Sequence, residues 1–279
     1  MAFIFFGVVF TVSWTFLHKS AKFRSLAQNI RADLASRVGS SVHALIIVPL
    51  LIYGIYEMEW DYYYVPQHSV AFLQRVLCFT VGYFLADFVI MVYYRTPRWQ
   101  IFCAHHFAAC TPYLVYMFVV PCPYGLFLLC SFLLVEATNP TLNILSYLKS
   151  LGKEGSAAYA ATLYCTAAIW PVFRLANPLY LIVVIHWKLF PSIPRANWKC
   201  VIPSVICAYF ILCFCIGGFV DIVIREVVKR WRANSTCCEI TSVRDLEALE
   251  VVTSTTESAA GSELTSLVKK TSPSMPASA

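Results

Sequence analysis

Two adjacent histidines, His105 and His106, lie within the long apolar segment IFCAHHFAACTPYLVYMFVV. An imidazole titrates near neutral pH, so it can exchange a proton or act as a nucleophile. Ionisable side chains are unfavourable at membrane depth and are retained mainly where they act. Consecutive helical residues point about 100° apart, so one histidine is expected to lead any chemistry. The alternative is a pair that packs between helices and bonds to neighbouring carbonyls or hydroxyls.

Further polar side chains interrupt the other apolar segments, and together they are the candidate lining of an intramembrane cavity. They are His43, Asp87, Glu136, Asn139, Asn143, Arg174 and Asp221. Glu136, Asn139 and Asn143 follow the spacing i, i+3, i+7, which places all three on one helical face. That face predicts a polar lining or a re-entrant turn at Pro140.

The remaining members of this set each have a structural alternative. Asp87 is expected to form an ion pair with Arg174 or His43, because an unpaired carboxylate would protonate there. Arg174 is expected to have a carboxylate or phosphate partner. His43 stands near the start of its apolar segment, where capping or reaching the membrane interface is the favoured interpretation. Asp221 precedes Arg225 by the spacing of an i,i+4 ion pair.

The composition predicts that these residues lie inside a membrane. Of the 279 residues, 59% are hydrophobic and 13% charged, and the mean hydropathy is +0.67. A soluble core of this length could not bury so much apolar surface. The apolar runs are continuous and not alternating, which excludes a β-barrel. The 12 cysteines show no paired spacing typical of a metal site, and none is expected.

The fold class is therefore predicted as an all-α, polytopic membrane bundle. A membrane about 30 Å thick requires about 20 apolar residues per helix, which gives about seven transmembrane helices. The segments are Ala2–Leu17, Val42–Tyr56, Phe72–Tyr94, Ile101–Val120, Pro121–Thr138, Ala157–Ile185 and Val201–Val228. The sixth contains Pro171 and Pro178, so it is expected to be a kinked helix or a helix plus a half-helix, leaving about six to eight spans.

The charges predict the orientation of the bundle. The net charge of +6 is concentrated in loops, and every second loop is basic, which places the N-terminus in the lumen and the C-terminus in the cytosol. One loop, residues 188–199, is basic on the wrong side. Such flanking charges indicate topology and not a nucleic-acid partner. Residues 233–279 form a Ser/Thr-rich segment without a sustained apolar face and are predicted to be a disordered cytosolic tail.

Four local patterns, SRVGSSVHA, GYFLADFVIM, AHHFAA and VEATNPTLN, occur in this order along the chain. Together they resemble the TLC-domain family, in particular its small members, which are related to ceramide synthases. The resemblance covers residues 37–232. It implies a six-helix TLC core that encloses a cavity, after an N-terminal membrane anchor and basic cytosolic loop in residues 1–36 and before the tail.

In ceramide synthases the adjacent histidines are implicated in moving a fatty acyl group from acyl-CoA to a sphingoid amine. Carried over, the resemblance implies that His105 and His106 are catalytic candidates, with fatty acyl-CoA as co-substrate and no other cofactor. The sequence departs from the enzymes further along. They have a His-Asp pair and a second Asp after the histidines, whereas CPYGLFLLCSFLLVEATNP contains only Glu136.

Whether the chain is an enzyme therefore stays open. The first hypothesis is a TLC-domain protein that binds or handles a lipid in a polar intramembrane cavity and contributes to membrane lipid homeostasis. The alternative is a ceramide-synthase-like N-acyltransferase. A proton-coupled transporter ranks third, because no internal repeat is evident. The expected partners are membrane lipids, fatty acyl or sphingoid, with a homo-oligomer left open. The family resemblance favours the endoplasmic reticulum or another internal membrane.

Overall fold

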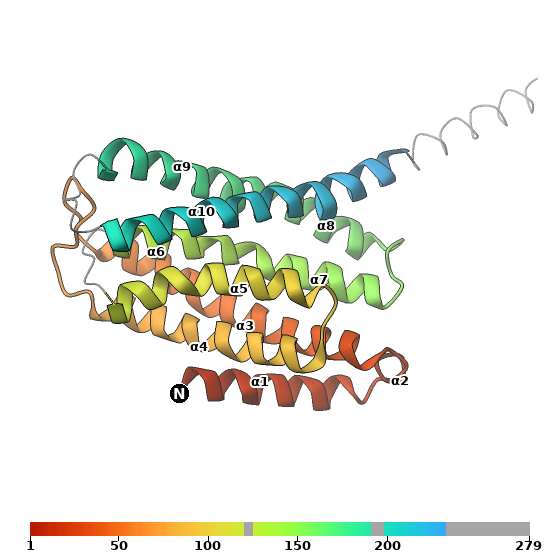
Figure 1. Ribbon diagram of the computed structural model, residues 1–279. Coiled ribbons are helices and arrows are strands. Elements are labelled where there is room, and N and C mark those ends of the chain that lie inside the picture. The colour runs from red at the N-terminus through yellow and green to blue at the C-terminus, as the bar shows by residue number, and fades with distance from the viewer. Residues whose placement is uncertain (120–124, 191–197, 233–279) are drawn as a thin grey trace, which may run out of the picture. The chain divides into compact units, whose positions relative to one another are not determined.

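The computed structural model describes residues 1–119, 125–190 and 198–232 (Figure 1). Residues Met1–Val223 form one compact unit, and the chain from Ile224 onward belongs to a second. Within that second unit, Glu226 lies 3.7 Å from Arg230 and 4.0 Å from Lys229 on the same helix. The predicted disordered tail, residues 233–279, lies outside the described residues.

The all-α, polytopic prediction is confirmed, since the described residues form helices joined by loops. Six helical spans in this part of the chain are long and apolar enough to cross a membrane: Gln28–Glu57, Ala71–Tyr94, Trp99–Phe118, Gly125–Ser150, Ala157–Lys188 and Val205–Arg232. The N-terminal apolar helix, Ala2–Leu17, is shorter.

The helices carry the labels of Figure 1. They are α1 (Ala2–Leu17), α2 (Ala21–Arg24), α3 (Gln28–Glu57), α4 (Ala71–Tyr94), α5 (Trp99–Leu114), α6 (Gly125–Phe132), α7 (Asn139–Ser150), α8 (Ala157–Trp170), α9 (Asn177–Val184) and α10 (Trp198–Gly218). Short 3-10 and π-helical segments extend or join them: η1 (Val115–Val119), η2 (Leu133–Thr138), η3 (Pro171–Ala176), η4 (Ile185–Leu189) and η7 (Phe219–Ile224).

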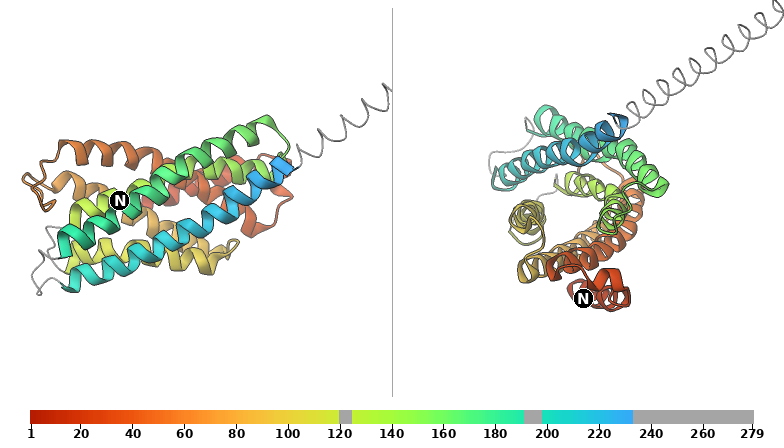
Figure 2. Two further views of the ribbon diagram at one scale, coloured as in Figure 1. Left: turned by 90° about the horizontal axis from the view of Figure 1, so that it is seen from above. Right: turned by 90° about the vertical axis from the view of Figure 1, so that its right-hand side faces the viewer.

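Within the first unit, helices from all six spans form a closed ring, and α6 lies inside it, where it packs on α3, α4, α9 and α10. Helix α3 packs on α4, α4 on α5 and α5 on α10; the ring continues through α9 and α8 to α7, which packs on α3. Figure 2 shows this order in its end-on view, with α1 outside the ring against α3 and α4. The close approach of α1 requires a glycine, because a Cβ atom at Gly82 would lie 2.5 Å from the Cβ atom of Ala2.

Two boundaries differ markedly from the sequence prediction. Helix α3 begins at Gln28 and not at Val42. The span predicted to end at Thr138 continues to Ser150, and Pro140 sits in the first turn of α7, where its missing N–H is tolerated. The re-entrant turn is therefore wrong.

The segment that contains Pro171 and Pro178 is one continuous helical span, Ala157–Lys188. Its path changes from α-helix to π-helix at Pro171–Ala176, because a proline inside a helix removes a backbone donor. One continuous helix is therefore confirmed, and the alternative of a helix plus a half-helix is wrong.

Candidate functional site

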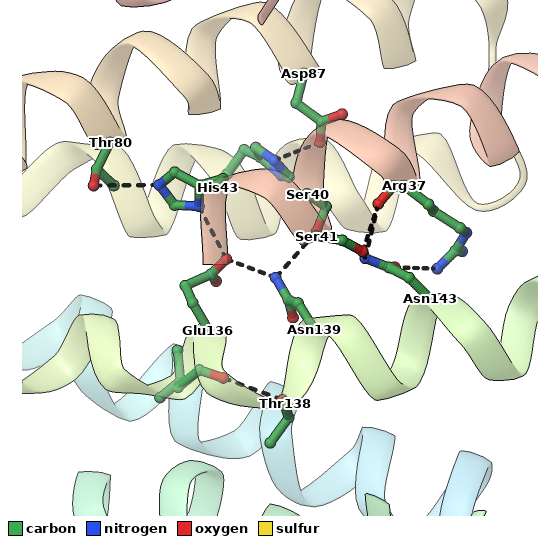
Figure 3. A network of polar contacts seen from close by, with 12 residues as sticks. Arg37, Ser40, Ser41, His43, Thr80, Asp87, Glu136, Thr138, Asn139 and Asn143 are labelled. Atoms are coloured by element: carbon green, nitrogen blue, oxygen red, sulfur yellow. Dashed lines mark hydrogen bonds and ion pairs between the residues drawn. The ribbon is translucent and has the colours of Figure 1, made fainter. Parts of the chain in front are cut away.

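A buried polar cluster occupies the middle of the ring, at the centre of five of the six spans. Its members are Ser36, Ser40, His43, Thr80, Asp87, His106, Glu136, Thr138, Asn139 and Arg174. Figure 3 shows its central contacts. Charged groups in a low-dielectric interior require such partners, so the contacts explain how these side chains are tolerated.

His106 pairs with Asp87. Its Nε2 lies 2.9 Å from Oδ2 of Asp87, within ion-pair distance, while its Nδ1 lies 2.9 Å from the carbonyl oxygen of Phe102. Asp87 also accepts a hydrogen bond from Ser36 on α3. The partners predicted for Asp87, Arg174 and His43, are therefore wrong, because α5 brings His106 against α4.

His43 forms a second histidine–carboxylate contact. It is fully buried, its Nδ1 lies 3.5 Å from Oε2 of Glu136, and its Nε2 lies 3.3 Å from the Thr80 hydroxyl. The ring stacks on Tyr83 at 4.0 Å between centroids. The prediction that His43 caps a helix or reaches the interface is wrong, because α3 begins four turns earlier and places His43 at mid-span.

Arg174 is 6% exposed, and the expected carboxylate partner is wrong for the described residues. It donates from Nε to the Val135 carbonyl and the Thr138 hydroxyl, and from its terminal nitrogen to the Asn139 side-chain oxygen at 2.5 Å. Its guanidinium lies over the Trp170 ring at 4.9 Å. The charge is thus held by neutral acceptors and an aromatic face.

The shared face of Glu136, Asn139 and Asn143 lies against α3. Asn139 contacts Ser40 at 3.2 Å, and Asn143 donates to Ser41 at 2.9 Å and to the backbone carbonyl of Arg37 at 3.0 Å. Asn139 and Asn143 are therefore part of a helix–helix contact, whereas Glu136 also borders a cavity.

That cavity has about 690 Å³ of empty volume, including its open mouth. Its walls are mainly apolar, with Ala108 and Pro112 from α5, Leu128 and Leu129 from α6, and Ala208 and Ile211 from α10. It extends from Glu136 to Gly125, a helical length of about 16 Å at 1.5 Å per residue. This shape and lining suit a hydrocarbon chain.

His105 and Glu136 give the cavity one polar end. The His105 ring stacks on Phe214 at 4.5 Å, and its buried Nδ1 makes no hydrogen bond within the described residues. The two histidines thus point in different directions, as the helical geometry predicts: His106 contacts Asp87, and His105 borders the cavity.

Asp221 lies apart from this arrangement. Its Oδ2 is 3.3 Å from Arg98, and its side chain is 37% exposed. Because it does not border the cavity and pairs with Arg98, outside the polar cluster, the structure does not bring it to the site with the other predicted residues.

Sequence reasoning missed the hydroxyl side chains Ser36, Ser40 and Thr80. A signal was present, since Ser36, Ser40 and His43 follow a heptad-like spacing on α3, and Thr80 precedes Asp87 by seven residues on α4. Serine and threonine are common at membrane helix contacts, so their spacing relative to ionisable residues is the informative part.

The site offers acid–base groups but no metal-binding group of three or more His, Cys, Asp or Glu side chains in the part of the chain that the structure describes. Comparison with known proteins gives one finding: residues 33–220 match the family model of the TLC domain. No curated protein and no solved structure matches the chain. The match spans the whole polar cluster and most of the chain, as the four sequence patterns predicted. The chain therefore belongs to the TLC-domain family and is a multi-pass integral membrane protein.

Proposed function

We propose that this protein binds one hydrocarbon chain of a membrane lipid in the cavity and holds the polar group of that lipid against His105 and Glu136. The observation that carries the proposal is the pairing of a long apolar cavity with a polar end at mid-span. A mainly apolar cavity with a few convergent polar groups is typical of a ligand site. Through this binding the protein would contribute to lipid homeostasis of the endoplasmic reticulum or another internal membrane.

A cavity-filling substitution tests this proposal. Ala208 is buried and borders the cavity, so Ala208→Phe places an aromatic ring in it. Ile206, two residues earlier on α10, is 63% exposed, and Ile206→Phe is the matched control. Native mass spectrometry of the purified proteins should detect a retained lipid in the unmodified chain and the control but not in Ala208→Phe. Equal retention by all three proteins would refute the cavity as the binding site.

Acyl transfer is the second candidate, and one specific observation favours it. Asp87 stands 2.9 Å from His106, in a position to supply a carboxylate partner that the sequence following the histidines lacks. In this reaction an amine attacks the carbonyl carbon of a fatty acyl-CoA, a histidine accepts the amine proton, and the thiol of CoA leaves with a proton. Labelled amide formed from acyl-CoA and a sphingoid base, and lost in both His105→Ala and His106→Ala, would support acyl transfer.

A further inference from the structure

Glu136 is the acidic group that borders the cavity, and its two oxygens have different surroundings. Oε2 accepts a hydrogen bond from the Asn139 amide at 2.6 Å and lies 3.5 Å from Nδ1 of His43. Oε1 has no recorded hydrogen bond among the described residues and belongs to a side chain that borders the cavity. One oxygen is therefore anchored, and the other is available to a ligand.

The orientation of the Asn139 amide is fixed by Arg174. A guanidinium only donates, so the Asn139 oxygen must face Arg174, and the amide nitrogen must face Glu136 and Ser40. Arg174 cannot reverse this order, because its Nε is also bound to the Val135 carbonyl and the Thr138 hydroxyl. The chain of donors thus runs in one direction, from Arg174 through Asn139 to Glu136.

We propose that Arg174 and Asn139 are positioning residues that hold Glu136 as a carboxylate, so that the lipid site accepts a head group carrying a hydrogen-bond donor. Hydrogen bonds donated to a carboxylate favour its charged form. A ligand carboxylate or phosphate would meet the like charge of Glu136, and the recorded donors of Arg174 are directed at protein acceptors. A hydroxyl or amine instead donates to Oε1.

This inference rests on the proposed lipid site for its ligand, but its electrostatic part can be measured without one. Infrared spectroscopy detects a buried protonated carboxyl group. At neutral pH the unmodified protein should show no such band from Glu136. Asn139→Leu removes the donor and should produce a band that disappears in Asn139→Leu/Glu136→Gln. The other ionisable groups near Glu136, namely His43, His105, Asp87 and Arg174, are unchanged in this comparison.

The control is Asn143→Leu. Asn143 lies one turn further along the same helix and bonds to Ser41 and Arg37. It is therefore not part of the chain of donors from Arg174 through Asn139 to Glu136. The Asn143→Leu variant loses as many side-chain hydrogen bonds as Asn139→Leu does. A purely structural effect would therefore appear in both variants. If Asn139→Leu does not fold, Asn139→Asp replaces it in the test. The new carboxylate should pair with Arg174. A proton shared between this carboxylate and Glu136 should then give the infrared band of a protonated carboxyl group. The absence of a Glu136-dependent band in the folded Asn139 variant, or an equal band in Asn143→Leu, would overturn the proposal.

Ligand choice provides the second measurement. Hexadecanol and palmitate have the same chain length but differ in donor and charge. Each should be tested for displacement of a photoreactive long-chain alcohol from the purified protein. We expect hexadecanol to compete and palmitate to compete at least tenfold less well. Asn139→Leu should weaken hexadecanol binding roughly tenfold, about 1.4 kcal/mol, since hydrogen bonds to charged groups are stronger than those to neutral groups.

The outcomes separate the two proposals. Equal competition by palmitate and hexadecanol would overturn the head-group preference while leaving a lipid in the cavity. The photoreactive alcohol could fail to label the cavity while the infrared result is as expected. That outcome would refute the donor-bearing ligand but support the hydrogen bonds from Arg174 through Asn139 to Glu136.

Discussion

The ion pair between Asp87 and His106 should make a measurable contribution to the stability of the bundle. Both residues are less than a tenth exposed, and Nε2 lies 2.9 Å from Oδ2. Removal of one partner from a buried pair typically destabilises a protein by about 3–5 kcal/mol, because the other charge remains uncompensated. We expect Asp87→Ala and His106→Ala each to lower the free energy of unfolding by about 3 kcal/mol, toward the lower end of that range.

A double-mutant cycle isolates the pair from the cavities that the substitutions leave. Polar contacts between membrane helices average about 0.6 kcal/mol in such cycles. The Asp87–His106 contact involves ionisable groups in a buried setting, so we expect a larger coupling energy of about 1–3 kcal/mol. The double variant should therefore be more stable than the sum of the single effects predicts. Reversible unfolding in mixed detergent micelles provides the free energies.

A second cycle on Arg98 and Asp221 is the control. Their side chains are 67% and 37% exposed, and they lie 3.3 Å apart. Pairs with this exposure contribute about 0.2–1 kcal/mol, so the coupling energy should be smaller than that of the buried pair. If the Asp87–His106 coupling energy does not exceed the control, the two residues do not form the ion pair, and the reasoning about the polar cluster fails.

Three further predictions concern helix contacts and one ionisation. Asn143→Leu should lower the free energy of unfolding by about 1 kcal/mol by removing contacts between α3 and α7. Gly82→Leu should displace α1 from α4, because its Cβ atom would clash with Ala2; loss of a cysteine crosslink between these helices would report it. The hydrogen bond between the hydroxyls of Tyr64 and Tyr180 raises the pKa of Tyr64 to about 12. Tyr180→Phe should lower the Tyr64 pKa toward 10 in an NMR titration, and an unchanged pKa would exclude that cause.

The raised pKa of Tyr64 also predicts how the free energy of unfolding changes with pH. A group whose folded pKa lies above its unfolded value stabilises the fold below the unfolded pKa and loses that contribution as pH rises through the folded pKa. For Tyr64 the window is therefore about pH 10–12. Because this side chain is only partly buried, the change should be small and should disappear in Tyr180→Phe.

The sequence predicts the bundle because continuous apolar segments and helical spacing are local properties. It also predicts that the rings of His105 and His106 separate, since the angle between neighbouring residues follows from helical geometry. The position of His43 could not be predicted correctly from the apolar segment alone. Helix α3 continues through the polar residues 28–41, which puts His43 at mid-span instead of at an end.

Partner choice was the least predictable feature of the site. The sequence offers several basic residues as partners for Asp87. His106 is its partner because α5 packs beside α4 in the ring of helices. The neutral environment of Arg174 is equally non-local, because its acceptors lie on η2 and at the first residue of α7. Such contacts depend on tertiary packing, which no single segment of sequence contains.

Photocrosslinking tests the central claim, that a lipid chain occupies the cavity, most directly. A long-chain alcohol with a photoreactive group near the end of its chain should be added to the purified protein, and the labelled peptides identified by mass spectrometry. We expect labelling at cavity residues such as Leu128 and Ile211, and its loss in Ala208→Phe. Labelling confined to outward-facing residues such as Ile206 and Leu179 would contradict it.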